Sequence, residues 1–479
     1  MQVKRLRSVA EFRERLGVLG IDTELGCDDS VDAGGPLSTP FSVTDGSAGT
    51  RMIGNRFCAL AMEGWDGTTE GRPTDLVRRR WQRFGASGAK LIWGGEAAAV
   101  CADGRANPRQ LVIDATTEAD IAALRSELVA THASTFDTTD DLVIGLQLTH
   151  SGRWCRPTGM PAPHAAQSHP ELDRRAPEGS VRVFSDEELD ALVDTYVDAA
   201  RHAAAAGFDF VDVKHCHGYL LHELLGSVNR PGRYGGSLAN RTAFLRAVVG
   251  GIRAALPSLM IGVRLSVYDF VPFAAGPDGV GEPLDASKRT YAFGADDSGV
   301  GVDLREAHQF LDVCRDLGIG MVCVTAGSPY YNPHIQRPAF FAPSDGYAPP
   351  EDPLVGVARM VAAAAELAVA HPEIAIIGSG YSYLQQWLPN VGQHVVRTGS
   401  AASIGIGRNM LSYPDLPADV LAGHPLRTAE VCRTFSDCTT APRNGLISGC
   451  FPLDPFYKAM PERIELAAIK RTSGRKVRR

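Results

Sequence analysis

Short runs of apolar, β-branched residues recur along the chain at wide spacing, and they set the expected architecture. Eight such runs span residues 56–62, 90–98, 142–149, 208–214, 260–266, 320–326, 374–379 and 402–406. Strands this continuously apolar are typical of a parallel sheet buried on both faces, because helices cover its outside. The segments between the runs have helical periodicity. The pattern therefore predicts alternating strands and helices.

Two of the intervening segments carry clear helix start and stop signals. The first begins at Ser185 with Glu188 three residues later, which is the spacing of a capping box, and it stops at Gly207. The second carries apolar residues at helical spacing over 245–252 and ends before Pro257. A strand is expected soon after each helix.

Eight repeats of a strand and a helix close most simply as a (β/α)8 TIM barrel of the α/β class, with an open doubly wound sheet as the alternative. We expect the barrel over residues 51–425. An N-terminal extension, residues 1–50, would hold one short helix capped by Ser8 and Glu11. A C-terminal segment, residues 426–479, contains cysteines and a basic tail.

Three connections are too long for simple turns, and they span residues 150–184, 267–303 and 327–352. Each follows the carboxyl end of a strand, the end at which TIM barrels build their active sites. They are rich in proline, glycine and aromatic residues. We expect them to form lids over a pocket, with surface decoration as the alternative.

Composition narrows the range of functions. The chain has 479 residues, with 48 Lys and Arg against 55 Asp and Glu, and its net charge of -7 argues against a nucleic-acid partner. The longest apolar run, 360–370, is interrupted by Glu366, so no membrane span is expected. The N-terminus has no apolar signal segment. We therefore expect a cytoplasmic protein whose 10 cysteines are thiols or ligands rather than disulfides.

Polar motifs follow the ends of several expected strands. Residues 147–153 read Gln-Leu-Thr-His-Ser-Gly-Arg, and residues 217–221 read His-Gly-Tyr-Leu-Leu. Further on come Tyr-Gly-Gly-Ser-Leu-Ala-Asn-Arg at 234–241 and Gly-Ile-Gly-Arg at 405–408. In this order the motifs resemble those of the old yellow enzyme family of flavin oxidoreductases over residues 50–415. The layout is most similar to the barrel domain of 2,4-dienoyl-CoA reductase and trimethylamine dehydrogenase.

The resemblance implies that the barrel binds FMN. Backbone N–H groups at a helix start and an arginine commonly hold phosphate, and glycine-containing loops after the seventh and eighth strands supply both. Arg264 matches the family position for positive charge near the flavin N1, and Gln147 matches the amide at the pyrimidine edge. Met62, Glu63 and Ala97 match positions that pack against the dimethylbenzene and N5 sides. The candidate cofactor residues are Ala61, Met62, Glu63, Ala97, Gln147, Arg264, Gly378, Ser379, Gly380, Gly407 and Arg408.

The same resemblance gives Tyr219 the role of proton donor, with core packing as the alternative. In the family this phenol protonates Cα after reduced flavin has delivered hydride to Cβ of an activated alkene. Lys214 and His217 occupy the positions of a pair, usually two His or His and Asn, that grips the substrate carbonyl oxygen. Glu63 stands where the family usually has Thr or Cys. We expect Glu63 and Lys214 to pair, because an isolated buried Glu would be driven to protonate.

Three late cysteines match part of an iron–sulfur signature. Larger relatives carry Cys-x2-Cys-x2/3-Cys-x11-Cys after the barrel. Its first, third and fourth positions are filled here by Cys432, Cys438 and Cys450. Phe435 stands at the second position and cannot bind iron. Loss of the cluster is the favoured hypothesis; the alternatives are a three-thiolate cluster with an open iron and a metal site completed by Asp437 or Asn444.

The resemblance therefore implies an NAD(P)H-driven FMN oxidoreductase that reduces an electron-poor C=C bond of a small molecule. One alternative is a flavin-dependent dehydrogenase of amine or ring substrates, which the altered carbonyl grip would suit. Another is a non-redox lyase or hydrolase that uses Lys214 and His217. We expect no Rossmann-type nucleotide domain of the kind the larger relatives carry, because few residues follow Ser412. A homo-oligomer is left open.

Overall fold

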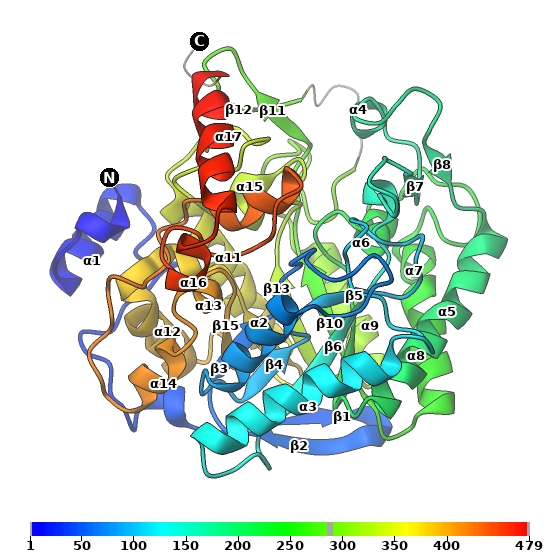
Figure 1. Cartoon of the computed structure of the whole chain (residues 1–479). Helices are drawn as coiled ribbons and strands as arrows, with labels where there is room; N and C mark the ends of the chain where they lie inside the picture. The colour runs from blue at the N-terminus through cyan, green and yellow to red at the C-terminus, as the bar shows by residue number, and fades with distance from the viewer. Residues whose placement is uncertain (1, 285–290, 477–479) are drawn as a thin grey trace.

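Eight parallel strands close into a barrel in the computed structural model, which describes residues 2–284 and 291–476 (Figure 1). Its strands are β3 (Phe57–Leu60), β4 (Leu91–Trp93), β6 (Val143–Thr149), β9 (Phe210–Val213), β10 (Met260–Ser266), β13 (Met321–Thr325), β14 (Ala375–Gly378) and β15 (Ser403–Ile406). Strands β15 and β3 pair, as do β4 and β6, so the sheet has no open edge. The expected TIM barrel is confirmed, and the open doubly wound sheet is excluded.

Each expected apolar run contains one barrel strand, but the second run is broken. Gly94 and Gly95 have φ angles of 85° and 48°, which side chains other than glycine rarely adopt. The chain turns there, and the short strand β5 (Ala97–Ala99) continues in parallel beside β6. The second run therefore yields β4 and β5 instead of one long strand.

A helix follows each barrel strand on the outside of the barrel. These helices are α2 (Asp75–Gly85), α3 (Glu118–Thr135), α5 (Asp186–Ala205), α8 (Ala243–Ala255), α9 (Arg305–Asp316), α11 (Pro353–Ala370), α12 (Leu388–Arg397) and α14 (Leu416–Leu421). The capping box predicted for α5 is confirmed, since the Ser185 hydroxyl accepts from the Glu188 N–H while the Glu188 carboxylate accepts from the Ser185 N–H. Helix α8 ends two residues before Pro257, as expected.

The barrel interior is filled by side chains, which include two large aromatic rings. Trp93 and Phe210 pack edge to face with centroids 5.2 Å apart. Glycines on other strands make room for them: a Cβ at Gly145 would lie 2.2 Å from the Phe210 ring, and one at Gly262 would lie 3.0 Å from the Trp93 ring. The barrel is therefore a packed core, and it has space for a ligand only beyond its strand ends.

A hairpin covers the amino-terminal end of the barrel, and the sequence pattern did not predict it. Strands β1 (Phe41–Asp45) and β2 (Gly49–Ile53) pair antiparallel, and their apolar residues join the interior cluster of the barrel. Buried Asp45 fixes the hairpin by accepting from Arg253 Nη1 at 2.9 Å and from the Ile261 N–H at 3.1 Å. Figure 1 shows the hairpin beneath the barrel, opposite α17 (Glu462–Lys476).

The N-terminal extension contains the expected short helix, α1 (Val9–Leu19). Its N-cap Ser8 accepts from the Glu11 N–H at 3.1 Å, which confirms the cap. The extension is tied to α12, where Asp28 accepts hydrogen bonds from Gln393 and Arg397.

The three long connections lie together but have different contacts. The connection 150–184 contains α4 (Pro170–Asp173), β7 (His164–Ala165) and β8 (Arg182–Val183), and Arg153 anchors it through an ion pair with Glu223. The connection 267–303 contains β11 (Phe273–Ala275) and β12 (Gly281–Pro283), which pack on the outside of 327–352. Part of it, 285–290, lies outside the described residues.

The three connections line one small cavity together, through residues such as Arg153, Phe270 and Tyr331, but they differ in their access to the main cavity. Only 327–352 reaches the main cavity, through residues near its helix α10 (Pro333–Gln336). The other two connections bury their contacts against α6 (Leu220–Leu225) and against 327–352, so they support the wall from behind.

Helix α11 is long and apolar enough to cross a membrane, and within the described ranges it alone passes that test. It is longer than the run 360–370 because its periodic apolar face begins at Leu354. The test is weak evidence here, since 56% of the helix is buried against the rest of the chain. Buried residues along it join the main hydrophobic core, as expected for a core helix.

The C-terminal segment packs back on the barrel. Its helices α15 (Asp437–Arg443), α16 (Pro455–Lys458) and α17 share a small apolar cluster. Arg79 and Arg83 of α2 both pair with buried Asp454, at 2.9 and 2.5 Å. The remaining short helices are α7 (Leu238–Arg241) and α13 (Asn409–Ser412), with 3-10 turns at Val3–Arg5, Pro36–Ser38, Gly46–Ala48, Gly152–Trp154 and Tyr381–Trp387.

Gly145→Ala should destabilise the barrel, because the added Cβ would lie 2.2 Å from the Phe210 ring. We expect the free energy of unfolding to fall by about 1–3 kcal/mol, the usual cost of overpacking a core. Urea denaturation followed by circular dichroism measures it.

The matched control is Gly250→Ala. Gly250 lies on the exposed side of α8, and a Cβ there meets no atom within 4 Å. Alanine is the better helix former, so this variant should gain up to about 1 kcal/mol. Equal effects of the two variants would contradict the packing argument.

Candidate active site

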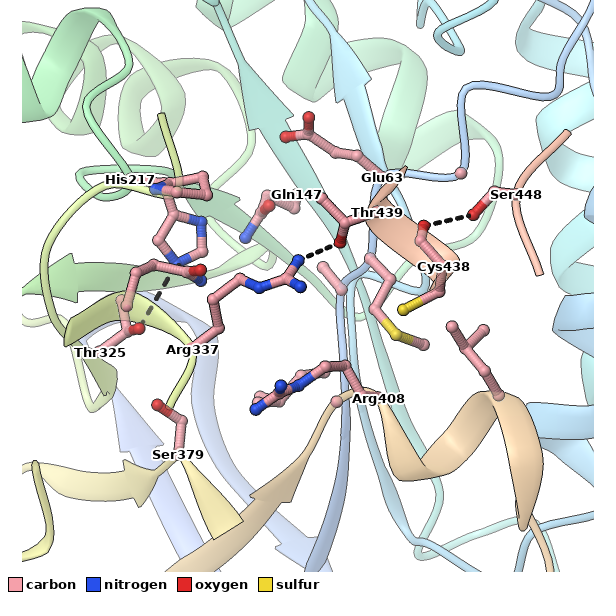
Figure 2. Close-up of a pocket in the computed structure, with 18 of the residues that line it drawn as sticks. Glu63, Gln147, His217, Thr325, Arg337, Ser379, Arg408, Cys438, Thr439 and Ser448 are labelled. Atoms are coloured by element: carbon pink, nitrogen blue, oxygen red, sulfur yellow. Dashed lines mark hydrogen bonds between the residues drawn. The ribbon is translucent and has the colours of Figure 1, made fainter. Parts of the chain in front are cut away.

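A cavity opens at the carboxyl ends of the barrel strands (Figure 2). Residues at the ends of β3, β6, β9, β10, β13, β14 and β15 line it. The connection 327–352 closes one side. The C-terminal segment closes another through Cys438, Thr439, Pro442, Arg443 and Ser448. Segments far apart in sequence meet here because parallel strands bring their carboxyl ends to one rim.

The sequence-based candidates are concentrated in this cavity. Its lining includes the proposed catalytic residues Lys214, His217 and Tyr219. It also includes nine of the eleven candidate cofactor residues, namely Ala61, Met62, Glu63, Gln147, Arg264, Ser379, Gly380, Gly407 and Arg408. Ala97 lies in β5, paired with Gln147, and Gly378 is the last residue of β14; both are in the barrel wall outside the lining.

Glu63 connects two of the proposed catalytic residues. Lys214 Nζ donates to Glu63 Oε1 at 2.5 Å, and the Tyr219 hydroxyl donates to the other carboxylate oxygen. Lys214 Nζ also lies 4.1 Å from the centroid of the Tyr219 ring. The expected Glu63–Lys214 pair is confirmed. It offsets the cost of burying an ammonium group that is only 2% exposed.

The network continues from Tyr219 to an aromatic wall. The hydroxyls of Tyr219 and Tyr330 lie 2.9 Å apart, and the Tyr330 ring stacks on Trp154 with centroids 4.2 Å apart and an interplanar angle of 8°. Trp154 is fixed by its Nε1, which donates to the Gly218 carbonyl. Burial, and then the Glu63 carboxylate, raise the pKa of Tyr219 well above 10, so the phenol keeps its proton at neutral pH.

His217 is held in a backbone conformation that histidine rarely adopts. Its φ angle is 66°, and the strain is maintained because its N–H donates to Ser266 Oγ while its carbonyl accepts from Ser328 Oγ. The ring Nε2 lies 3.4 Å from Thr325 Oγ1 (Figure 2). Burial, and then Arg264 and Lys214, lower the pKa of His217 well below 6.5, so the ring is neutral at physiological pH.

Asp212 of β9 holds two residues of the cavity lining in place, and the sequence reasoning missed it. Its buried carboxylate accepts from Trp93 Nε1 at 2.7 Å, from Gln147 Nε2 at 2.6 Å and from the Arg264 N–H at 2.7 Å. Burial raises the pKa of Asp212, and the three donors oppose that rise. Its sequence signal was an acidic residue in the apolar run Phe-Val-Asp-Val. Asp212 fixes the Gln147 amide and the backbone that carries the Arg264 side chain.

A buried ion cluster beside the cavity was also missed. Arg80 pairs with Asp66 at 2.5 Å and with Glu96 at 3.1 Å, and all three side chains are at most 4% exposed. The Gly64 N–H donates to Glu96 Oε1 at 2.8 Å, so the cluster also fixes the chain just after Glu63.

The three late cysteines converge on a second, smaller cavity. Cys432, Cys438 and Cys450 line it together with Phe435, and Cys438 also lines the main cavity. Phe435 packs on Phe341, with ring centroids 5.5 Å apart. All ten cysteines of the chain are free, in agreement with the expectation of thiols.

A separate group of three possible metal ligands lies close together elsewhere in the structure. Within 2–284 and 291–476, only Cys101, Asp103 and His150 bring three such atoms within 4.8 Å of one another. His150 Nδ1 accepts the Gly152 N–H at 3.1 Å, which leaves its proton on Nε2. In that tautomer Nδ1 is occupied as an acceptor and Nε2 carries the proton, so neither ring nitrogen has a lone pair available for a metal.

Several known proteins are similar to this chain in sequence. Residues 40–277 match the model of the NADH:flavin oxidoreductase / NADH oxidase family. The NADPH dehydrogenase of Geobacillus sp. (strain WCH70) is 26% identical over 238 residues, which are 49% of this chain and 64% of that protein. The NADPH dehydrogenase of Bacillus subtilis (strain 168) is 28% identical over 236 residues, with the same coverage. The match thus spans less than two thirds of these relatives.

Solved structures share the fold over more of the chain. A 2-naphthoyl-CoA reductase complex has a TM-score of 0.66 at 17% identity, covering 89% of this chain and 58% of that one. Histamine dehydrogenase from Rhizobium sp. 4-9 has a TM-score of 0.64 at 19% identity, covering 89% and 53%. The old yellow enzyme homologue from Zymomonas mobilis has 0.56 at 20%, covering 81% and 93%. The predicted resemblance to old yellow enzyme is confirmed.

Glu63→Gln should lower the pKa of Tyr219, because it removes the carboxylate charge that contributes to the raised value. Ultraviolet difference spectra against pH, each corrected with the same protein carrying Tyr219→Phe, isolate this phenol. An unchanged titration would contradict a charged Glu63 beside Tyr219. Glu306→Gln is the control, because Glu306 accepts from Tyr291 at 2.5 Å outside the cavity. It should leave Tyr219 unaffected.

Proposed function

We propose, from the match of residues 40–277 to the NADH:flavin oxidoreductase / NADH oxidase family, that the chain is an FMN-dependent oxidoreductase that takes electrons from NAD(P)H. We further propose that it reduces an electron-poor C=C bond of a small molecule, with Tyr219 as proton donor. The observation that supports this most is the Tyr219 phenol in the cavity, bonded to Glu63 beside Lys214. We propose a reducing cytoplasm as the compartment, because all ten cysteines are free.

The residues of the cavity fit FMN. Arg264 Nε and Arg408 Nη1 are buried without a hydrogen-bond partner among the described residues, as donors awaiting an acceptor would be. The space beside Gly407 is open, since a Cβ there would meet no atom within 4 Å. Arg264 and Gln147 would hold the pyrimidine side, and Gly380, Gly407 and Arg408 the phosphate. When bound, FMN supplies hydride transfer between nicotinamide and substrate.

The chain's own part in the reaction is to hold and move a proton. Tyr219 carries it, because the raised pKa keeps the phenol neutral until an acceptor develops negative charge nearby. Tyr330, at 2.9 Å, offers a route for its replacement toward the aromatic wall. Glu63 accepts from the same hydroxyl, and Lys214 Nζ lies over the Tyr219 ring. These contacts support the role of an acid that is held in place.

Lys214 and His217 are the proposed grip on the substrate oxygen. Lys214 keeps two of its three ammonium donors beyond the bond to Glu63, and an ammonium stabilises an oxyanion as a point charge. Neutral His217 contributes one N–H. A charged donor beside a neutral one suits an oxygen on which negative charge grows, as in a carbonyl-activated alkene.

Oxidation of an amine or ring substrate is the second candidate. Tyr330, stacked on Trp154, lines the cavity with the Glu63 carboxylate and favours it, because an aromatic ring and a carboxylate both attract a cation. A non-redox lyase or hydrolase remains the alternative without flavin. A chain that stays colourless after FMN is added would contradict both flavin proposals.

Tyr219→Phe should separate the two half-reactions. We expect reduction of the flavin by NAD(P)H to stay within about threefold, while reoxidation by enones or enoyl thioesters slows by about 100-fold or more, because the acid is lost. Anaerobic stopped-flow absorbance follows both steps.

The control for that experiment is Tyr196→Phe. It removes a buried hydroxyl that lies on α5, outside the cavity. Equal slowing in both variants would count against Tyr219 as the acid. Flavin reduction by amines, without reoxidation by any alkene, would favour the dehydrogenase.

For the late cysteines we propose loss of the four-cysteine iron–sulfur cluster, since the residues do not fit it. Phe435 occupies one ligand position and packs on Phe341. Asp437, a possible substitute, forms an ion pair with Lys470 of α17. A cluster iron would have to displace that ion pair or remain without a protein ligand.

Anaerobic purification followed by iron analysis tests this proposal. We expect substoichiometric iron and no thiolate-to-iron charge-transfer absorbance. About three or four iron atoms per chain, lost in Cys450→Ser, would overturn it.

A further inference from the structure

Two arginines extend into the main cavity without a carboxylate partner. Arg337 comes from the connection 327–352 and Arg408 from the end of β15, and Figure 2 shows both side chains directed into the same space. Neither forms an ion pair with a carboxylate of the described residues, whereas Arg80 and Arg443 of the same cavity do.

Arg80 pairs with Asp66 and Glu96, and Arg443 pairs with Asp345 at 2.7 Å. Arg264 forms no ion pair, but Asp212 accepts its backbone N–H and contributes an attractive charge. Asp345 also attracts Arg337, but its ion pair is with Arg443. Arg337 and Arg408 therefore have no carboxylate partner of their own among the described residues.

The donors of Arg337 are only partly used. Its Nη2 donates to Ser436 Oγ at 2.9 Å, and its Nη1 donates to Thr439 Oγ1. Both acceptors are hydroxyls of the C-terminal segment. The Nε group is buried with no acceptor among the described residues. Burial, and then the charges of Arg408 and Arg443, lower the pKa of Arg337, which is the effect of an uncompensated cation in a protein interior.

Arg408 also has a buried donor that no described residue accepts. Its Nη2 donates to the Pro338 carbonyl at 2.8 Å, and its Nη1 is buried without a partner among the described residues. The carbonyl belongs to the residue that follows Arg337, so the two arginines are joined through one short stretch of backbone. Two such guanidinium groups in one cavity repel each other unless an anion lies between them or beside them.

We propose that Arg337 and Arg408 together bind a phosphate monoester, with Arg337 held ready by Ser436 and Thr439. A phosphate dianion carries two negative charges and three terminal oxygens, which match two guanidinium groups in charge and in donor geometry. The sources of that chemistry are the phosphate of FMN and a phosphorylated substrate. The first source rests on the proposed function. The proposal adds Arg337 and the C-terminal segment to the cofactor site, beyond the segment 40–277 that the family model covers.

The arrangement also explains why a segment so late in the chain lines the cavity. Ser436 and Thr439 flank Cys438 in sequence, and they hold the Arg337 guanidinium through hydroxyls that carry no charge. A carboxylate there would neutralise Arg337 and compete with an incoming anion. Hydroxyl partners orient the guanidinium and leave its charge available.

Arg337→Gln in the full-length chain freed of flavin tests the proposal. FMN and riboflavin differ only by the phosphate, so the ratio of their dissociation constants measures phosphate recognition. We expect the variant to lose at least tenfold in FMN affinity and less than twofold in riboflavin affinity, as flavin fluorescence reports during titration. Arg408→Gln should do the same.

Two comparison variants separate recognition from folding. Arg443→Gln changes an arginine that Asp345 already compensates, so the FMN-to-riboflavin ratio should stay within about twofold. Ser436→Ala with Thr439→Val should reduce FMN affinity selectively but less than Arg337→Gln, because the charge remains. Equal loss of FMN and riboflavin affinity in Arg337→Gln would show a merely structural arginine and overturn the proposal.

The remaining outcomes distinguish the source of the phosphate and the proposed function. If the parent chain binds FMN and riboflavin with equal affinity, the FMN phosphate is not the group that Arg337 and Arg408 bind, although the chain still binds flavin. Inorganic phosphate is then the probe: thermal stabilisation of the parent by phosphate, abolished in both arginine variants, supports a phosphorylated substrate. The same stabilisation without any flavin binding supports the site and contradicts the flavin function. No stabilisation in that case overturns the site as well.

Discussion

The closed barrel depends on the match between two aromatic rings and two glycines in its interior. Trp93 and Phe210 fill the space that Gly262 and Gly145 leave open, so the strands can close at the observed register. With the interior packed, polar chemistry is displaced to the carboxyl rim, where the motifs of the sequence meet. Trp93 connects the two regions, because its ring fills the core while its Nε1 donates to Asp212.

At the carboxyl end of the barrel, buried cations are paired with carboxylates. The Glu63 carboxylate balances Lys214, and Asp66 and Glu96 balance Arg80. Each of these carboxylates comes from a connection after β3 or β4, whereas their cations come from β9 and α2. The balance is thus achieved between elements, and it stabilises the relative positions of those elements as well as the charges.

The sequence predicted what depends on local pattern. Eight apolar runs, the capping box at Ser185 and the residue types of the strand ends were sufficient for the barrel and for most of the cavity lining. The Glu63–Lys214 pair followed from the cost of burying either charge alone. The Asp212 partners, the β1–β2 hairpin and the wall from the C-terminal segment could not be predicted, because they are long-range contacts that no periodicity encodes. The connection 150–184 does not reach the main cavity, because Arg153 pairs with Glu223, and it lines a smaller cavity with the other two connections.

The position of the cavity wall in the chain also fixes an order of assembly during synthesis. Every barrel strand has been translated by Ile406, so the barrel can close before residues 438–448 have left the ribosome. At that stage the cavity lacks one wall, and Arg337 lacks Ser436 and Thr439. A nascent chain can therefore possess the complete scaffold while its pocket is still open to water, and the last translated contacts convert the open rim into an enclosed site.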